Sequence, residues 1–321
     1  MGLGKMGNGS RFAICSAALF TITLLFSMSY GYGQSKQIKR LTVEALTVRA
    51  HEHEASTETE APLPMDEMRL EHSLPQADRI IHKPSAVETN MRKSLPFANF
   101  YIPILEYHDV NFVLGNPYTM SPAQFNEEMS FLKKHGFQTI SLDDVYNAIY
   151  LGQVLPKRPI VLTFDDGYTS SFTSATPILK KYGFKATEFM VSGFINKKGF
   201  LTKPQLQEMV ESHIWQIGSH TLDHPNLTKQ NPTQLRQQVS ESRKDLSVEV
   251  HQSIDYFCYP FGAYDGNVLR AVAKAGYRLA VCTDNGYANP ATDGPYLLNR
   301  IAVHQGLSID TFSKLLARSL E

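Results

Sequence analysis

From about residue 100 onward, short apolar runs alternate with segments of helical period, and this alternation limits the possible folds more than any other feature. A strand buried on both faces reads as a short, continuous apolar run, and a helix between two such strands joins them in parallel. The pattern therefore predicts βα units and a largely parallel sheet. The apolar runs are 102–105, 160–164, 186–191, 214–218, 254–259, 277–282 and 297–303.

Three of the intervening segments carry helix-start signals, in which a serine or asparagine cap is followed by proline or by an acid in the first turn. About eight strands and seven helices fall in roughly 220 residues, a number that one parallel barrel accommodates. The fold class predicted for residues 100–321 is α/β, a single distorted parallel (β/α) barrel of seven to eight strands. An open doubly wound sheet is the competing fold, although no G-x-G-x-x-G follows the first strand. The helix starts are Ser121-Pro122, Ser141-Leu142 with Asp144, and Asn231-Pro232.

The N-terminus predicts export. Lys5 and Arg11 precede an apolar run, 12–26 or 12–28, that is shorter than the roughly 20 residues of a membrane-spanning helix, and a small polar stretch follows. We expect residues 1–32 to be a signal peptide, or else a membrane anchor through 12–28, on a secreted or cell-surface protein.

Residues 33–99 show little apolar periodicity. Seven acids and one arginine lie between His51 and His72, which indicates a solvated flexible linker. The whole chain balances 31 basic against 31 acidic residues, so its charge gives no indication of a nucleic-acid partner.

Cysteine usage is sparse. Of three cysteines, Cys15 lies in the apolar run, so Cys258 and Cys282 remain to form one disulfide or to stay as buried thiols.

Two adjacent acids, Asp165 and Asp166 in "LTFDDGY", directly follow a predicted strand. In a parallel α/β fold, functional groups gather at the C-terminal ends of strands. Burying two neighbouring carboxylates is unfavourable unless something compensates their charge, so we expect them to face a site. Taken alone, Asp-Asp-Gly is also a common turn.

Two histidines four residues apart, His220 and His224 in "SHTLDHPNL", follow another predicted strand. Two imidazoles at this spacing can share a divalent ion, although an isolated pair is often only solvated. One carboxylate with two histidines leaves coordination positions open, as catalytic metal sites do. A carboxylate bound to metal is a poor proton acceptor, so the second acid would be the base.

"TFDDGY" and "SHTLDHPNL", with "IPILEYHDV" before them and "FCYPFGAYD" after them, resemble the motifs of the polysaccharide deacetylases, the NodB-homology domain of carbohydrate esterase family four. The versions here look like those of the extracellular exopolysaccharide and cell-wall branches. The resemblance covers about residues 100–318.

The resemblance implies the roles of the site residues. Asp165 would be the general base, and Asp166, His220 and His224 would bind a divalent metal, most often Zn²⁺, with Co²⁺, Ni²⁺ or Mn²⁺ as alternatives. Water activated at that metal would attack the acetamide carbonyl of an N-acetylglucosamine unit. The substrate-binding segment would be Tyr259, Pro260, Phe261 and Gly262.

Two positions depart from the family pattern. Many members have an arginine two residues before the third-motif proline, where this chain has Cys258, so we expect Arg300 to orient the base instead. The leucine-x-histidine motif is not matched cleanly, and His304 is the candidate general acid, with a surface histidine as the alternative.

The expected function is metal-dependent hydrolytic N-deacetylation of an N-acetylglucosamine polymer, an exopolysaccharide or peptidoglycan, with release of acetate. A carbohydrate-binding pseudoenzyme of the cell wall and an amidase acting on a small non-sugar amide are the alternatives. Both acids and both histidines are present, which favours the enzyme.

Overall fold

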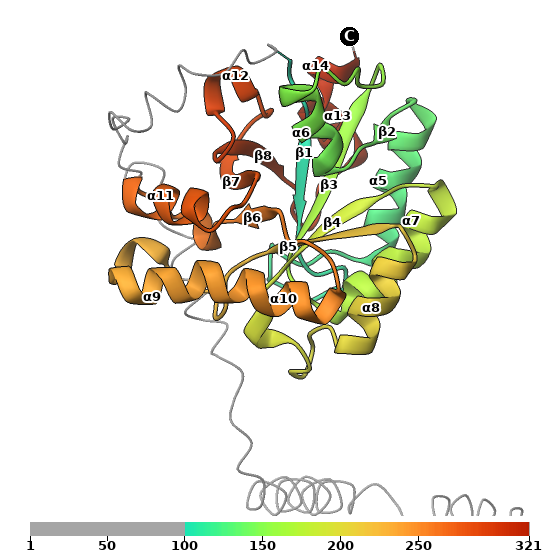
Figure 1. Ribbon diagram of the computed structural model, residues 1–321. Coiled ribbons are helices and arrows are strands. Elements are labelled where there is room, and N and C mark those ends of the chain that lie inside the picture. Colours follow the sequence, from blue (N-terminus) through green and yellow to red (C-terminus); the bar gives the residue numbers. More distant parts are fainter. Residues whose placement is uncertain (1–99, 321) are drawn as a thin grey trace, which may run out of the picture. The chain divides into compact units, whose positions relative to one another are not determined.

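The computed structural model describes residues 100–320 (Figure 1). The predicted signal or anchor (1–32), including its apolar run 12–28, and the predicted linker (33–99) lie outside the described residues. Between residues 100 and 320, none of the helices has the length and apolar character that crossing a bilayer requires.

Seven parallel strands form a closed barrel in the order β1-β8-β7-β6-β5-β4-β3, and the pairing of β1 with β3 completes the ring. An eighth strand, β2, pairs with the first two residues of β3, Pro159 and Ile160. The predicted barrel is confirmed, and each of the seven apolar runs overlaps one barrel strand. The strands are β1 (Ile104–Tyr107), β2 (Gln138–Thr139), β3 (Pro159–Asp166), β4 (Ala186–Met190), β5 (Trp215–Ser219), β6 (Tyr256–Cys258), β7 (Leu279–Asn285) and β8 (Leu298–Ala302).

Helices occupy the connections between the strands (Figure 1). The three predicted caps are confirmed: Ser121 accepts a hydrogen bond from the third residue beyond it, and Ser141 and Asn231 each form a capping box. The helices are α5 (Pro122–Lys134), α6 (Leu142–Tyr150), α7 (Thr176–Tyr182), α8 (Lys203–Glu211), α9 (Pro232–Arg236), α10 (Ser242–Val250), α11 (Gly266–Lys274), α12 (Pro290–Asp293), α13 (Ile309–Leu315) and α14 (Ala317–Leu320).

Two π-helical turns extend these helices, Ser171–Ala175 before α7 and Gln237–Glu241 between α9 and α10. Neither was expected, because a π turn inserts one residue without disturbing the apolar spacing strongly enough to be seen in the sequence.

The core has two layers because each barrel strand is buried on both faces. Inward-pointing side chains such as Val161 and Phe189 form one cluster with the apolar side chains of α6, which therefore covers the end of the barrel where the strands begin. Outward-pointing side chains such as Phe164 form the second cluster, beneath the other helices. Gly218 on β5 makes room for Phe189, since a Cβ there would lie 2.5 Å from its ring.

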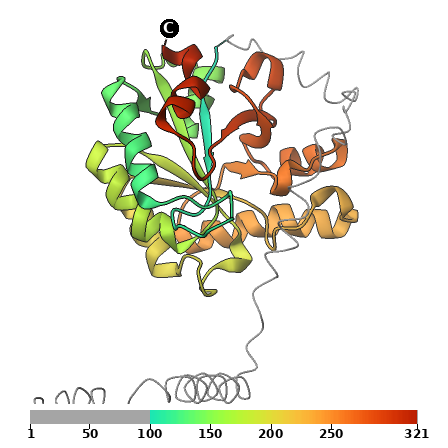
Figure 2. The same cartoon turned by 180° about the vertical axis from the view of Figure 1, so that it is seen from behind.

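The C-terminal helices pack against α5, the first helix of the described chain. Seen from behind, the C-terminal helices lie beside α5, and Phe312 of α13 packs edge-on against Phe131 of α5 with ring centroids 5.8 Å apart (Figure 2).

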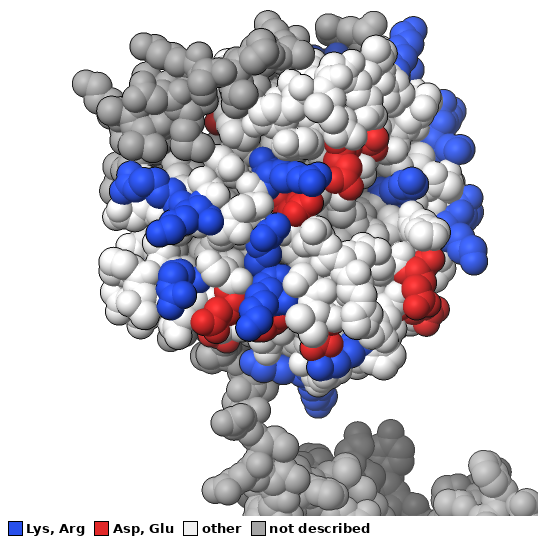
Figure 3. Space-filling model, in the orientation of Figure 1, with Lys and Arg blue, Asp and Glu red and all other residues white. Residues whose placement is uncertain are grey.

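On the face drawn in Figure 3, basic and acidic side chains are intermingled. Among the ion pairs of the described residues, Asp255 pairs with both Arg243 (3.1 Å) and Arg278 (3.2 Å).

Candidate active site

The candidate site lies where the barrel strands end. Because all strands are parallel, side chains at their C-terminal ends meet at one end of the barrel. Asp165 and Asp166 end β3, His220 directly follows β5, and Cys258 ends β6. Arg300 on β8 reaches the same place.

Asp165 and Arg300 form a buried ion pair that is joined by two hydrogen bonds. The guanidinium donates from Nη1 to Oδ1 (2.8 Å) and from Nη2 to Oδ2 (2.7 Å), and both side chains are almost completely buried. Burial would raise the pKa of Asp165, but Arg300 outweighs it and holds the pKa well below its usual range. Asp165 is therefore ionised at neutral pH, with Arg300 in contact with it as the sequence suggested.

Arg300 is itself fixed on several sides. Its Nε donates to the carbonyl of Cys282 (3.0 Å), its Nη1 also donates to the hydroxyl of Thr163 (3.1 Å), and Oε2 of Glu106 lies 3.4 Å from Nη2. These contacts account for a buried guanidinium, which is tolerated only where its donors are paired.

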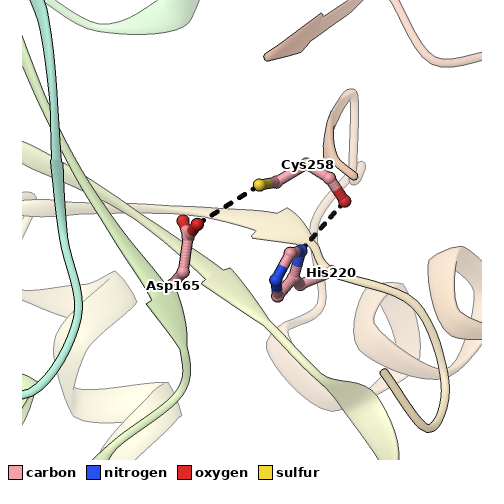
Figure 4. Close-up of side chains that lie close together, drawn as sticks. All are labelled: Asp165, His220 and Cys258. Carbon is pink, nitrogen blue, oxygen red and sulfur yellow. Dashed lines mark hydrogen bonds between the residues drawn. The ribbon is translucent and has the colours of Figure 1, made fainter. Parts of the chain in front are cut away.

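Cys258 lies between the ion pair and the first histidine (Figure 4). Its thiol is 3.4 Å from Oδ2 of Asp165 and 3.2 Å from Nη2 of Arg300, and its carbonyl oxygen is 2.9 Å from Nδ1 of His220. Cys258 and Cys282 are both free, buried thiols and do not form a disulfide.

Asp166, His220 and His224 form a second group. Oδ1 of Asp166 lies 3.6 Å from Nε2 of His220 and 3.4 Å from Nε2 of His224, and the two imidazole nitrogens are 3.1 Å apart. Oδ2 of Asp166 is buried and has no hydrogen-bond partner among the described residues. Burial, followed by the charge of Asp165, raises the pKa of Asp166 to about 8.

The local backbone directs these ligand atoms. Asp166 (φ 79°) and His224 (φ 58°) have left-handed conformations that only a well-determined surrounding sustains. The amide of His224 donates to the hydroxyl of Thr221 (2.9 Å). Because Nδ1 of His220 faces a carbonyl, it carries the proton, which leaves Nε2 as a lone-pair donor.

A divalent cation fits the Asp166, His220 and His224 group. Two imidazole nitrogens that lie close to each other and to a carboxylate whose Oδ2 has no hydrogen-bond partner among the described residues are satisfied together by one shared cation. Two other groups within residues 100–320 bring ligand atoms together, and both include Asp165. Arg300 already occupies both oxygens of Asp165, so a cation there would face the guanidinium charge. These groups are Asp165, His220 and Cys258, and Glu106, His108 and Asp165.

Glu106 and His108 extend the ion-pair side of the site. Nε2 of His108 lies 3.9 Å from Oε1 of Glu106, and the His108 side chain is 12% exposed, so it borders the site. Burial raises the pKa of Glu106 to about 7, although Arg300 opposes the shift. Glu106 was not predicted, but it occupies an inward position two residues after Ile104, and that alternation was the available signal.

His304 is not part of these groups of convergent ligand atoms. It is exposed, and its ring centroid lies 6.2 Å from that of Tyr118, whose ring also contacts His108 at 5.1 Å. His108 lies close to Glu106 and Asp165, whereas His304 does not. The role of His304 as general acid stays a prediction.

The predicted substrate segment divides into two parts. Tyr259 is fully buried and donates its hydroxyl to the carbonyl of Tyr296 (3.0 Å), and Pro260 is buried as well. Both side chains therefore belong to the interior, and substrate binding by this segment stays a prediction. Phe261 and Gly262 are partly exposed, and the Phe261 ring packs edge-on against His224 at 4.6 Å.

Comparison with known proteins gives a consistent result. Residues 152–280 match the family model described as polysaccharide deacetylase. A Bacillus subtilis (strain 168) protein named as a polysaccharide deacetylase, YxkH, is 35% identical over 211 residues, covering 66% of this chain and 74% of the relative. The poly-β-1,6-N-acetyl-D-glucosamine N-deacetylase of Staphylococcus aureus (strain MRSA252) is 28% identical over 214 residues, covering 63% of this chain and 72% of that protein.

A solved structure is also similar. The structure of the Streptococcus pyogenes deacetylase PplD in complex with acetate superposes with a TM-score of 0.64 at 29% sequence identity. The match covers 70% of this chain and 100% of that chain.

Proposed function

Because the chain belongs to the polysaccharide deacetylase family, we propose that it is a zinc-dependent enzyme that deacetylates N-acetylglucosamine units of an extracellular polysaccharide and releases acetate. That it is an enzyme that hydrolyses N-acetyl amide bonds follows from the family and its named deacetylases. The metal, the sugar and the place of action are the proposal.

One observation carries the proposal: a carboxylate held ionised by Arg300 lies directly beside a group of three convergent ligand atoms. Amide hydrolysis needs a base for water and positive charge for the developing oxyanion. Asp165 supplies the base. Asp166, His220 and His224 would hold a divalent cation, which supplies that positive charge and lowers the pKa of a nearby water.

The chain's own residues divide the remaining work. Asp165 accepts the proton of the attacking water, because Arg300 keeps it ionised and in a fixed orientation. We assign protonation of the leaving amine to His108, in place of His304, because Glu106 lies beside His108 and can stabilise its cationic form. Phe261 provides an apolar surface next to His224, suited to the face of a sugar ring.

The substrate class is supported by the relatives. The Staphylococcus aureus protein is named for a β-1,6-linked N-acetylglucosamine polymer. We extend that class of polymer to this chain, with peptidoglycan as the alternative substrate. The ligand set also accepts Co²⁺, Ni²⁺ or Mn²⁺.

An extracellular location is part of the same proposal. It rests on the sequence of residues 1–32, in which basic residues precede an apolar run, and on the acidic stretch that follows. A polymer at the cell surface is a substrate that an exported enzyme reaches, secreted or anchored through residues 12–28.

Acetate release tests the proposal. The full-length chain is stripped of metal, restored with Zn²⁺, and incubated with β-1,6-linked and β-1,4-linked N-acetylglucosamine oligomers and with peptidoglycan fragments. We expect zinc-dependent acetate release that falls by about 10³-fold in Asp165→Asn. Asp223→Asn is the matched control, because this exposed acid between the two histidines contacts Gln238 and not the ligand atoms.

The outcomes separate the alternatives. Acetate release that persists after metal removal, or in Asp165→Asn, would contradict the mechanism. No release from any polymer by zinc-loaded enzyme would favour a small amide as the substrate. His108→Ala should lower turnover far more than His304→Ala, and the reverse order would return the acid role to His304.

A further inference from the structure

Glu188 is a buried acid with no part in the mechanism described so far. It lies in the middle of β4 and is 0% exposed. Its register partner on β3 is Phe164, so its side chain points to the outer, apolar layer and not into the barrel with Asp165. A carboxyl group among apolar side chains is unfavourable unless a specific partner retains it.

One hydrogen-bond partner of Glu188 is the backbone of the turn that carries Asp166. Oε1 of Glu188 accepts a hydrogen bond from the amide of Gly167 (2.9 Å), the residue directly after Asp166. On the other side of the same residue, the Gly167 carbonyl accepts from the amide of Leu201 (2.8 Å). Gly167 is thus held from two directions.

This turn needs to be held because its conformation is unusual. Asp166 (φ 79°) and Gly167 (φ 88°) are both left-handed, and non-glycine residues persist there only where the surroundings determine them. The turn also packs closely on β4, since a Cβ on Gly167 would lie 2.0 Å from the sulfur of Met190. The direction of the Asp166 carboxylate toward His220 and His224 depends on this backbone.

We propose that Glu188 is a positioning residue for metal binding: by accepting the Gly167 amide, it fixes the Asp166 turn in the conformation that binds the cation. The inference rests on the proposed function, because it requires that the Asp166, His220 and His224 group bind zinc. It adds a residue on the opposite face of the sheet, outside the motifs that define the site.

Glu188 acts through geometry and not through charge. Burial raises the pKa of Glu188 well above its usual range, which favours the neutral form of the carboxyl group. Glutamine, which presents the same carbonyl oxygen without an acidic proton, should therefore replace it. Methionine has a similar length and no strong acceptor, and aspartate is one methylene too short to reach the amide.

Zinc affinity, measured by competition with a chromogenic chelator on the metal-stripped full-length chain, tests the proposal without using activity. We expect Glu188→Met and Glu188→Asp to weaken zinc binding by about 10- to 100-fold, the effect usual for partners that orient a ligand. Glu188→Gln should stay within about threefold of the unaltered chain.

Glu128→Met is the matched control. Glu128 is also a buried acid, but it accepts from the Tyr107 hydroxyl (3.0 Å) and from Gln124 (2.9 Å), and neither partner belongs to the metal group. Its loss should lower stability and leave zinc affinity within about threefold.

Each outcome is decisive. Unchanged zinc affinity in both Glu188→Met and Glu188→Asp overturns the proposal, as does equal weakening by Glu128→Met. If Glu188→Met does not fold, Glu188→Asp against Glu188→Gln gives the same comparison. Absence of zinc binding by the unaltered chain would instead contradict the proposed function, so the two failures are distinguishable.

Discussion

Asp165 and Asp166 are neighbours in sequence and both are buried, yet their pKa values shift in opposite directions. Asp165 has the guanidinium of Arg300 on both oxygens, whereas Oδ1 of Asp166 faces two imidazoles and its Oδ2 has no hydrogen-bond partner among the described residues. The cause is the strand geometry, since Asp165 points into the barrel and the left-handed conformation of Asp166 turns its side chain away. One strand end therefore presents a base that is ionised at neutral pH and, next to it, a carboxyl group that is available to a cation.

The largest effect is expected from removing the guanidinium of Arg300, which pairs with Asp165. Arg300→Met leaves Asp165 and Glu106 uncompensated, and breaking a buried pair in this way costs about 3–5 kcal/mol of folding stability. The pKa of Asp165 should rise toward that of its neighbour, so the acidic limb of the pH profile of kcat/KM moves to higher pH. Urea unfolding at pH 7 and the pH profile measure the two effects.

Arg278→Met is the matched control for this change. Arg278 pairs with Asp255 and Asp143, but its side chain is 48% exposed, so its loss should cost less than about 1 kcal/mol. Equal destabilisation by the two variants, or an acidic limb that does not move in Arg300→Met, would show that the ion pair does not set the charge of the base.

Glu128 is a buried acid whose pKa is raised, whereas that of Asp165 is lowered. Its contribution to folding stability should therefore fall as the pH rises. Burial raises the pKa of Glu128 to about 7, above the value of roughly 4.3 in the unfolded chain. The folded state therefore binds this proton more tightly, and its contribution to stability is complete below about pH 4 and is lost as pH rises toward 7, at up to about 1 kcal/mol per pH unit.

Glu128→Gln removes this titration. Subtracting the unfolding free energies of the variant and the unaltered chain, measured from pH 5 to pH 8.5, cancels the titration of all other groups. We expect the difference to move in favour of the variant up to about pH 7 and then to level off. A difference that stays constant over the whole range would contradict the raised pKa.

The smallest effect concerns the thiol of Cys258, which only adds to the contacts of the Asp165 and Arg300 pair. A thiol is a weak donor, so Cys258→Ala should cost about 0.5–1 kcal/mol and lower turnover by less than about fivefold. Cys258→Ser restores a donor, and Cys282→Ala is the control because its thiol does not contact Asp165. A loss of 100-fold in Cys258→Ala would mean that Arg300 alone cannot orient the base.

Spacing and pattern predicted the barrel and the four residues that converge at its end. Strand ends in a parallel fold lie at one edge, so Asp165, Asp166, His220 and His224 could be expected near one another before any contact was seen. Helix caps at Ser121, Ser141 and Asn231 depend on adjacent residues alone, and they too were predictable.

Contacts across the barrel were harder to predict. Arg300 was the candidate partner of Asp165, but its further contacts with Glu106 and Cys258 depend on the closure of the ring and on which strands face each other inside it. Nothing in the sequence pattern indicated the role of Glu188, because its side chain contacts the backbone of the turn after β3 from the outer face of the sheet. The exposed position of His304 depends on the loop after β8, whose course no periodicity describes.

Closure of the ring by the first and last strands also has a consequence for how the chain folds. Arg300 and Asp165 are 135 residues apart, and β8 is the last strand to be synthesised. Until β8 inserts between β7 and β1, the interior of the growing sheet holds Asp165 without its guanidinium. Contacts between such distant residues form late because a long loop must first close, so we expect the ion pair of Asp165 and Arg300 to form only when β8 is in place. A chain that still lacks β8 thus has both acids of the site and lacks the guanidinium that pairs with Asp165.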